Sequence, residues 1–454
     1  MKKLQKNILL AYSVGSIGTG IFSTVPSILL LYYMTNILGI PVQLAALGIF
    51  IPKIWDMITD PLVGYISDKT ISRWGRRRPY LFVGSWLMPV CFMLIFTVPD
   101  FEDPLHSFFY VLSTFILSAT TYTIFAVPYM AMPSEMSNDP LQRTRIVSYR
   151  MTFAMIGILL GAAMAPTMVE YFGGGKSGYI YMAGILGLIC FICMQVTSLF
   201  AKDIPLIEQK HKSVALSRQI ALAFNNKPFV ILQVTYLFQL IGIGVFTSMV
   251  PFFVIHVLQQ GQGHVGLLFL ISLGMSTLSI PVWGMISNRY GKTFGYYLAV
   301  FIYAVSLAGL SLSTSFTYGP ELVMLLLGFG FAGLQVLPYS LLTDVIHYDT
   351  KLTGSSREGI LTGIWTACEK TGLAFGPLVA GILLAWFGFI ESSENIKALP
   401  QAESTLNGIL ITVSLVPALF VSISTIFITS FKIPQTQEEP QVQLSVESTL
   451  KTIR

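Results

Sequence analysis

Charged residues are scarce in this sequence. Aspartate, glutamate, lysine and arginine together make up 11% of its 454 residues, whereas soluble domains hold about a quarter. Hydrophobic residues make up 54%. This composition excludes an ordinary soluble domain and predicts a membrane protein. The net charge of +5 resides in connecting segments that a membrane would orient, so it does not predict a nucleic-acid partner.

Cysteine and histidine are also few, with four and five residues respectively. The cysteines all lie in apolar runs, and we expect them to be reduced packing residues. Cys190 and Cys193 have the CxxC spacing, but the second ligand pair that a zinc site needs is missing. No nucleophile–base or metal grouping has the spacing that an enzyme needs. We therefore predict that the protein is not an enzyme and has no catalytic residue and no cofactor.

Long apolar runs, by contrast, fill the chain. Each is long enough to cross a bilayer, which takes about 20 helical residues. The runs are too long and too uniformly apolar to be strands of a membrane barrel, so they predict helices. Twelve runs can be placed, at about 8–33, 42–67, 79–99, 106–132, 145–170, 178–200, 228–258, 264–287, 294–313, 319–343, 358–388 and 404–430.

Lysine and arginine gather in alternate connections between these runs. The segments 73–78 and 202–227 are basic, whereas the connection around residues 100–103 is acidic. Basic connections stay in the cytoplasm in most membrane proteins. The pattern therefore predicts an integral protein of the cytoplasmic (inner) membrane with both termini in the cytoplasm.

An internal repeat divides the chain. Residues 61–69, PLVGYISDK, match residues 281–289, PVWGMISNR, 220 positions later. The tripeptides VPY at 127–129 and LPY at 337–339 form a second pair. Such self-similarity predicts two related halves of six helices each. The expected division is residues 1–200 for the N-terminal six-helix bundle, 201–227 for a cytoplasmic linker loop, 228–430 for the C-terminal six-helix bundle and 431–454 for a cytoplasmic tail.

The repeat also separates scaffold from function. Gly64 and Gly284 recur at matching positions, so we expect them to allow close helix contact and a tight turn. The charges beside them are assigned to topology and to gating of a conformational change, not to ligand binding. These charges are Asp68, Arg76, Arg77 and Arg289.

Three charges interrupt the second apolar run. Lys53, Asp56 and Asp60 are spaced so that they share one face of a helix. Counting from Asp68 at 1.5 Å per residue places Asp56 about 18 Å deep, near the middle of an apolar core ~30 Å thick. A charge at that depth costs roughly 2.5–3.5 kcal/mol, so three on one face require a polar interior. Uncharged residues stand at the positions of both acids in the second half.

Two more charges lie in other runs, Lys370 near the middle of the apolar core and Arg150 at a shallower level. Lys370 lies about 20 Å, and Arg150 about 7–8 Å, from the basic edge of its run. Both are candidate partners for the acids across one central cavity. Three plainer interpretations stay open: Asp60 and the proline after it cap a kinked helix, Asp56 and Lys370 form a permanent structural pair, or Lys53 snorkels toward the surface.

Three segments resemble the signatures of the glycoside–pentoside–hexuronide:cation symporters, the melibiose-permease-like branch of the major facilitator superfamily. They are WDMITDPLVGYISDKTISRWGRRRPY at 55–80, VPYMAMPSEMSNDPLQRTRIVSYRMTF at 127–153 and DVIHYDTKLTGSSREGILTGIWTACEKTG at 344–372. The resemblance implies an all-α membrane protein of the major facilitator fold, with twelve transmembrane helices in two pseudo-symmetric six-helix bundles. It also implies transport by alternating access, coupled to Na⁺ or H⁺.

The resemblance further implies roles for particular residues. The acids at 56 and 60 match the family positions that help to bind the coupling cation, and they form a possible Na⁺ site. Arg150 and Lys370 match positions tied to sugar binding and charge balance. The predicted cation set is Asp56, Asp60, Thr59 and Thr123, and the predicted substrate and charge-balance set is Arg150, Lys370, Lys53, Thr19, Tyr129 and Trp365.

The sequence departs from the family at its sugar site. The family's two sugar-binding acids fall at Gly20 and Ala126, and its stacking aromatic falls at Met130. This loss argues against a melibiose-like galactoside and shifts the cation site toward H⁺ or weaker Na⁺ binding. We predict a monomer in the lipid bilayer that carries a sugar or glycoside together with the cation. A lysophospholipid or other amphiphile is the alternative substrate, and a non-transporting membrane receptor is the alternative from another class.

Overall fold

The computed structural model describes residues 6–137, 139–200, 223–353, 358–392 and 399–432, and all of its regular structure is helical. Twelve helical spans in these residues are long and apolar enough to cross a membrane, which confirms the predicted fold class. The predicted linker and tail lie largely outside the described residues. The helices are α1 (Lys6–Val25), α2 (Val42–Lys69), α3 (Arg78–Phe96), α4 (Pro104–Met136), α5 (Pro140–Leu159), α6 (Ala165–Tyr171), α7 (Gly175–Phe200), α9 (Lys227–Phe252), α10 (Gln262–Tyr290), α11 (Lys292–Ser313), α12 (Gly319–Thr353), α13 (Glu358–Trp386), α14 (Glu403–Val413) and α15 (Leu415–Ile428), with π-helical turns η1 (Pro26–Leu30), η2 (Tyr33–Ile37), η3 (Leu160–Met164) and η5 (Phe253–Val257).

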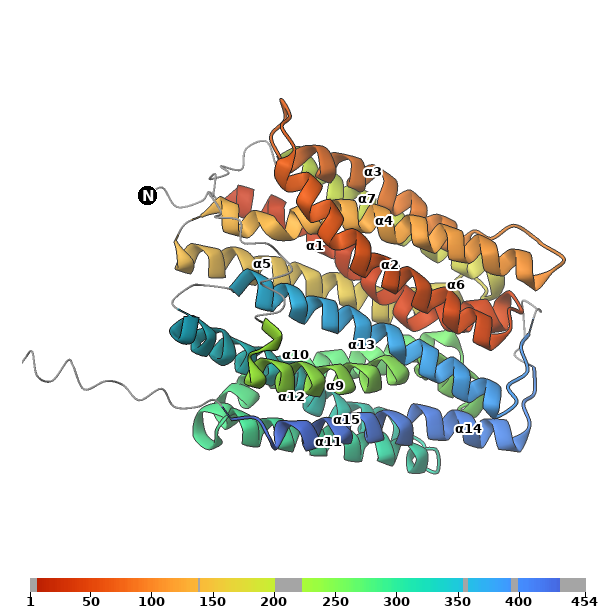
Figure 1. Ribbon diagram of the computed structural model, residues 1–454. Helices are drawn as coiled ribbons and strands as arrows, with labels where there is room; N and C mark the ends of the chain where they lie inside the picture. Colours follow the sequence, from red (N-terminus) through yellow and green to blue (C-terminus); the bar gives the residue numbers. More distant parts are fainter. Residues whose placement is uncertain (1–5, 138, 201–222, 354–357, 393–398, 433–454) are drawn as a thin grey trace, which may run out of the picture.

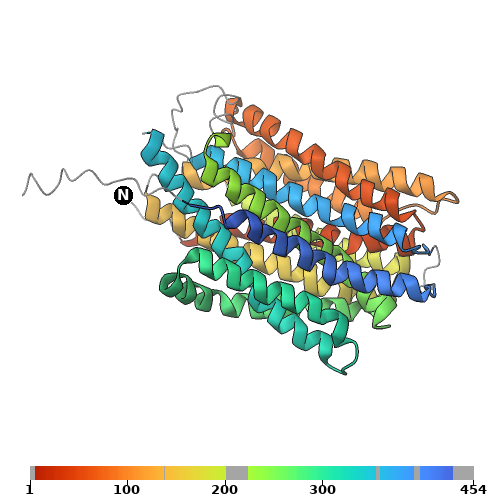
Figure 2. The same cartoon turned by 60° about the horizontal axis from the view of Figure 1, so that its bottom comes forward.

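The helices run along one common axis, and the two halves of the chain lie side by side (Figures 1 and 2). In Figure 1 the N-terminal helices α1–α7 form the upper part and α9–α15 form most of the lower part. The end of the molecule that holds Lys69, Arg289 and Lys351 is called the basic end here. The opposite end, with Asp100 and Glu391, is called the far end.

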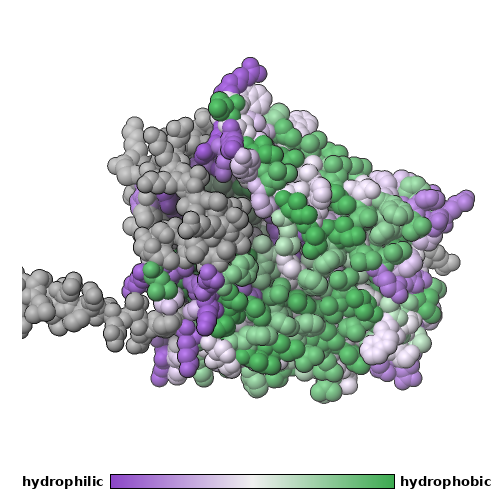
Figure 3. Space-filling view, viewed as in Figure 1, coloured by the Kyte–Doolittle hydropathy of each residue, from purple (hydrophilic) through white to green (hydrophobic). Residues whose placement is uncertain are grey.

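The flank of the molecule is apolar and both ends are polar (Figure 3). Large hydrophobic side chains stay exposed along the flank, such as Leu278 at 77% and Phe301 at 65%. An apolar band of this extent is costly in water but stable against lipid tails. The surface therefore agrees with an integral membrane protein.

Contacts between the halves are tight at the far end. A Cβ atom added at Gly381 of α13 would lie 2.5 Å from the Cβ of Ala46 in α2, and one added at Gly266 of α10 would lie 2.2 Å from the carbonyl oxygen of Ala163 in η3. Phe375 in α13 packs edge-on against Phe50 in α2, with ring centroids 5.0 Å apart. Only residues without a side chain let backbones approach this closely, so the far end is closed in this conformation.

The halves separate toward the basic end. A Cβ atom at Gly64 would meet only Val127 of its own half, at 3.6 Å, and one at Gly284 would meet nothing within 4 Å. The helices α2 and α10 also continue past these glycines. The prediction of close helix contact and a tight turn at Gly64 and Gly284 is therefore wrong for this conformation, because a side chain would fit at both positions and both helices continue.

Each half is fastened internally at the basic end. Arg77 is 4% exposed, and its Nη2 lies 2.6 Å from Glu135 Oε1 and 2.5 Å from Asp68 Oδ1. In the C-terminal half, Lys292 Nζ lies 2.6 Å from Asp344 Oδ1. Glu135 and Asp344 both follow the repeated Pro-Tyr pair, so each half has an ion pair in a comparable segment.

Candidate functional site

Asp60 forms the centre of a polar cluster between the two halves. Thr123 of α4 donates a hydrogen bond of 2.9 Å to Asp60 Oδ1, and Lys370 of α13 forms an ion pair with Asp60 Oδ2. The helix α2 runs unbroken through Pro61, so Asp60 does not cap a broken helix. The two oxygens of Asp60 therefore serve different halves of the protein.

Asp56 lies one turn away from Asp60 and is deeply buried. It is 2% exposed, and the Thr123 hydroxyl lies 3.5 Å from its Oδ1 atom. Lys53 interacts electrostatically with both acids, and its Nζ atom lies 5.9 Å from the ring centroid of Phe115. One threonine hydroxyl thus lies between two carboxylates, as it would beside a small bound cation.

Lys370 pairs with Asp60 and not with Asp56. The sequence left the lysine's facing open and suggested Asp56 as its structural partner. The side chains of Lys370 and Asp60 are 23% and 25% exposed, so water reaches the pair in this conformation. In the described part of the chain, the hydrogen bonds and ion pairs that join the halves lie between the far end and this pair.

Arg150 of α5 has no carboxylate partner among the described residues. Its Nε atom is buried without a hydrogen bond, and its nearest polar contact is the Met151 sulfur, 3.8 Å from Nη2. It interacts electrostatically with the hydroxyl groups of Tyr12, Tyr122 and Tyr129. A cation that a membrane protein leaves unpaired is costly, which favours a role toward a ligand.

Four residues of the predicted sets are occupied elsewhere. The hydroxyls of Thr59 and Thr19 bond back to carbonyl groups of their own helices. Tyr129 is fully buried and bonds Ser16 and the backbone of Tyr12. Trp365 is 1% exposed and stacks on another aromatic ring. These four side chains support the helices that carry the cluster.

Tyr122 is a residue that the sequence did not single out. Its ring stacks on Phe22 at a centroid distance of 4.6 Å, and Lys370 Nζ lies 6.0 Å from its centroid. It interacts electrostatically with Asp56, Asp60 and Arg150. Its position directly before Thr123 in α4 was the one sign in the sequence that it could lie near the cation cluster.

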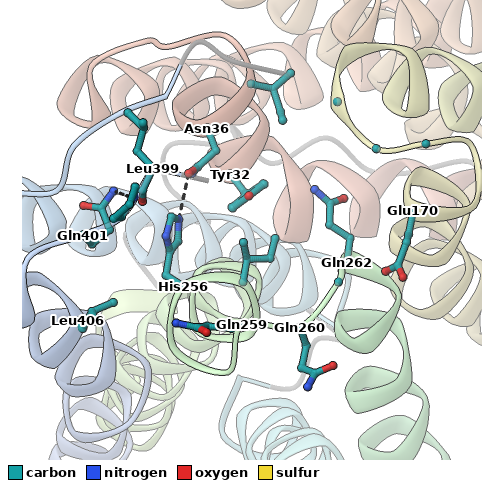
Figure 4. Close-up of a pocket in the computed structure, with 17 residues that line it drawn as sticks. Tyr32, Asn36, Glu170, His256, Gln259, Gln260, Gln262, Leu399, Gln401 and Leu406 are labelled. Carbon is teal, nitrogen blue, oxygen red and sulfur yellow. Dashed lines mark hydrogen bonds between the residues drawn. The ribbon is translucent and has the colours of Figure 1, made fainter. Parts of the chain in front are cut away.

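A second polar region closes the far end. The side chains of His256 and Asn36 form a hydrogen bond of 3.0 Å between the halves, beside a cavity of about 760 Å³ (Figure 4). Glu170 accepts a hydrogen bond from the backbone of Gly263. Outside the spans at the same end, a hydrogen bond from Lys176 lowers the pKa of Asp100 below its usual value. These contacts belong to the closed side of the molecule and not to the central cluster.

Residues 11–435 match the family described as MFS/sugar transport protein. The chain belongs to this family. It is therefore a membrane transporter of the major facilitator superfamily and not an enzyme.

Members of the MFS/sugar transport family and solved structures resemble the chain over most of its length. The putative glycoside/cation symporter YagG of Escherichia coli is 24% identical, over 97% of this chain and 94% of that protein. The sodium-dependent lysophosphatidylcholine symporter 1 of Mus musculus is 26% identical, over 76% of this chain and 71% of that protein. The crystal structure of a D-xylose–proton symporter matches with a TM-score of 0.68 at 15% identity, over 95% of this chain and 99% of that chain, which supports the fold.

Proposed function

We propose that the protein is a cation-coupled symporter that carries a sugar or glycoside by alternating access. The coupling ion, Na⁺ or H⁺, binds at Asp56 and Asp60 with Thr123. The observation that carries the proposal is the division of Asp60 between Thr123 of one half and Lys370 of the other. This division makes the ion site and the contact between the halves the same group of atoms.

Charge balance gives a mechanism for coupling. Asp56 and Asp60 are balanced by Lys53 and Lys370 while the site is empty. A bound cation competes with Lys370 for Asp60 and releases the contact between the halves. Because a net charge within the membrane is costly, the halves rearrange most easily after the released lysine has found new partners. In our proposal, a bound substrate supplies them.

The basic end faces the cytoplasm in this proposal, and the membrane is the cytoplasmic membrane. The charge distribution of the connections supports that orientation. The conformation described here, closed at the far end and open at the basic end, is then the inward-facing state. In this proposal the charges at the basic end gate the conformational change. They are Asp68, Arg76, Arg77 and Arg289.

A lysophospholipid is the second candidate substrate. Two exposed methionines, Met130 at 47% and Met151 at 53%, favour it because flexible apolar chains suit an acyl tail. The name of the mouse relative lends it further support. The glycoside stays first because the E. coli relative, named for glycoside, matches over more of its own length.

The test is gradient-driven uptake into proteoliposomes. Wild-type protein is given an inward Na⁺ or H⁺ gradient with a panel of labelled glycosides and lysolipids, and we expect one class to accumulate. Asp60→Asn is expected to abolish accumulation, whereas Glu102→Gln, in an exposed loop, leaves it intact. Full accumulation by Asp60→Asn refutes the cation site, and no uptake of any compound by the wild type favours the receptor.

A further inference from the structure

The repeated tyrosines have different surroundings in the two halves. Tyr129 is sealed in the N-terminal half, and its hydroxyl bonds Ser16 and the Tyr12 backbone. Its counterpart Tyr339 is 41% exposed, and its hydroxyl donates a hydrogen bond of 2.9 Å to Glu369 Oε2. An open ring beside a carboxylate in only one copy of a repeat points to a function beyond the scaffold.

Only one oxygen of the Glu369 carboxylate accepts a hydrogen bond from the described residues. Its other oxygen, Oε1, has no hydrogen-bond partner among the residues that the structure describes, and the residue is half-buried. The adjacent Lys370 points about 100° away around α13 and pairs with Asp60. Glu369 therefore keeps an accepting oxygen for a ligand.

The carboxylate is held by a compact group of rings. Trp365, one turn before Glu369, stacks on Tyr236 of α9 with centroids 4.0 Å apart and planes 13° apart. Tyr339 meets the Trp365 ring nearly edge-on, at 5.5 Å. Side chains of α9, α12 and α13 thus fix both the exposed ring and the acid, which is the preorganisation that a binding site needs.

A residue of the N-terminal half also interacts with this acid. Tyr122 of α4 interacts electrostatically with Glu369, and in the part of the chain that the structure describes its hydroxyl makes no hydrogen bond. Tyr122 also lies beside the ion pair of Lys370 and Asp60. A ligand held by Glu369 would therefore lie within electrostatic reach of Lys370 and of the cation cluster.

We propose that Glu369 and Tyr339 form the hydroxyl-binding subsite of the transporter, for a neutral polyhydroxylated solute such as a glycoside. Carboxylates accept the hydrogen bonds of sugar hydroxyls strongly, and an exposed aromatic ring packs against the apolar face of a sugar. The subsite names the substrate class of the symporter and rests on that proposed function.

The first test uses Glu369→Gln and Tyr339→Phe in proteoliposomes that take up 4-nitrophenyl glycosides. For the best wild-type glycoside, we expect KM to rise at least tenfold in Glu369→Gln, with a smaller rise in Tyr339→Phe, which keeps the ring. Glu321→Gln is the matched control, since that acid contacts His264 at the far end. Stabilisation of each purified variant by Na⁺, or proton release on binding, reports the cation site separately and is expected to be unchanged.

The second test separates ligand binding from helix bracing. Each variant is assayed with glycosides that lack one hydroxyl. If Glu369 binds a hydroxyl, one deoxy glycoside binds wild type and Glu369→Gln equally, because the lost interaction is counted only once. An equal loss of affinity for the parent and every deoxy analogue, or wild-type affinity in Glu369→Gln, overturns the subsite.

The substrate class can fail while cation coupling stands. Uptake of lysolipids alone by the wild type, still abolished by Asp60→Asn, overturns the hydroxyl subsite only. Full accumulation by Asp60→Asn overturns the proposed cation site, whatever Glu369→Gln does. The two proposals are supported together by a glycoside that wild type accumulates, that Asp60→Asn does not accumulate, and for which Glu369→Gln has a raised KM.

Discussion

Lys370 in the C-terminal half forms an ion pair with Asp60 in the N-terminal half, and the two positions are 310 residues apart in the chain. Lys370→Ala should leave an uncompensated carboxylate and lower stability by roughly 1–3 kcal/mol, less than for a fully buried pair because water reaches these side chains. The double variant Lys370→Ala with Asp60→Asn should recover thermal stability but not accumulation. Thermal unfolding in detergent measures the first and proteoliposome uptake the second.

The matched control for that experiment pairs Lys370→Ala with Asp56→Ala. Because Asp56 is not the partner of Lys370 in this conformation, the second substitution should recover less stability than Asp60→Asn does. Equal recovery in both double variants would show that the lysine is shared between the acids.

Thr123 should control the affinity for the coupling ion. Its hydroxyl bonds Asp60 at 2.9 Å and lies 3.5 Å from Asp56. Thr123→Val removes a hydrogen bond to a charged group, worth about 1.5 kcal/mol or more, so half-saturation should need about tenfold more cation. Thr123→Ser keeps the hydroxyl and should stay within a few-fold of wild type. The measurement is initial uptake against cation concentration, and equal affinities in Val and Ser variants would contradict the assignment.

Arg77 should matter for stability as well as for gating. It is buried and pairs with Asp68 and Glu135, so Arg77→Ala leaves Glu135 without its closest partner. Because Arg76 Nη2 still lies 2.8 Å from Glu135 Oε1, we expect a loss of about 1–3 kcal/mol, seen as a lower unfolding temperature and a lower yield in the membrane. Arg73→Ala is the control, because Arg73 is exposed and lies over Trp74. A stable Arg77→Ala protein with failed uptake would show that Arg77 serves gating alone and contradict its role in stability.

The hydrogen bond between His256 and Asn36 should favour the state that is closed at the far end. Asn36→Ala removes a bond worth about 1 kcal/mol, which shifts the two-state balance roughly fivefold toward far-end opening. Distances between spin labels placed across the far end would measure this shift. Gln260→Ala, in the same cavity, is the control, since its side chain forms no hydrogen bond with described residues.

The sequence predicted the twelve spans and the common face of the three charges because both depend on local periodicity. It could not predict which acid meets Lys370, since helix spacing does not fix how one helix is rotated against another. Tyr129 and Trp365 were expected at the substrate site, but both are buried. Position along a helix does not show whether a side chain lines the substrate cavity or packs behind its lining. The prediction for Gly64 and Gly284 failed for another reason: a glycine repeated in the sequence does not show that a neighbouring helix lies close to it.

The contrast between Tyr129 and Tyr339 bears on how such a protein can be rebuilt. A chain that arose by doubling one six-helix unit starts with two identical interiors, and it gains a vectorial task only when the copies diverge. Here one copy holds the acids and a sealed tyrosine, and the other holds the lysine and an open one. The copies are no longer interchangeable. A transporter assembled from two N-terminal halves would hold four carboxylates, two Asp56 and two Asp60, and would lack Lys370 as the ion-pair partner from the other half.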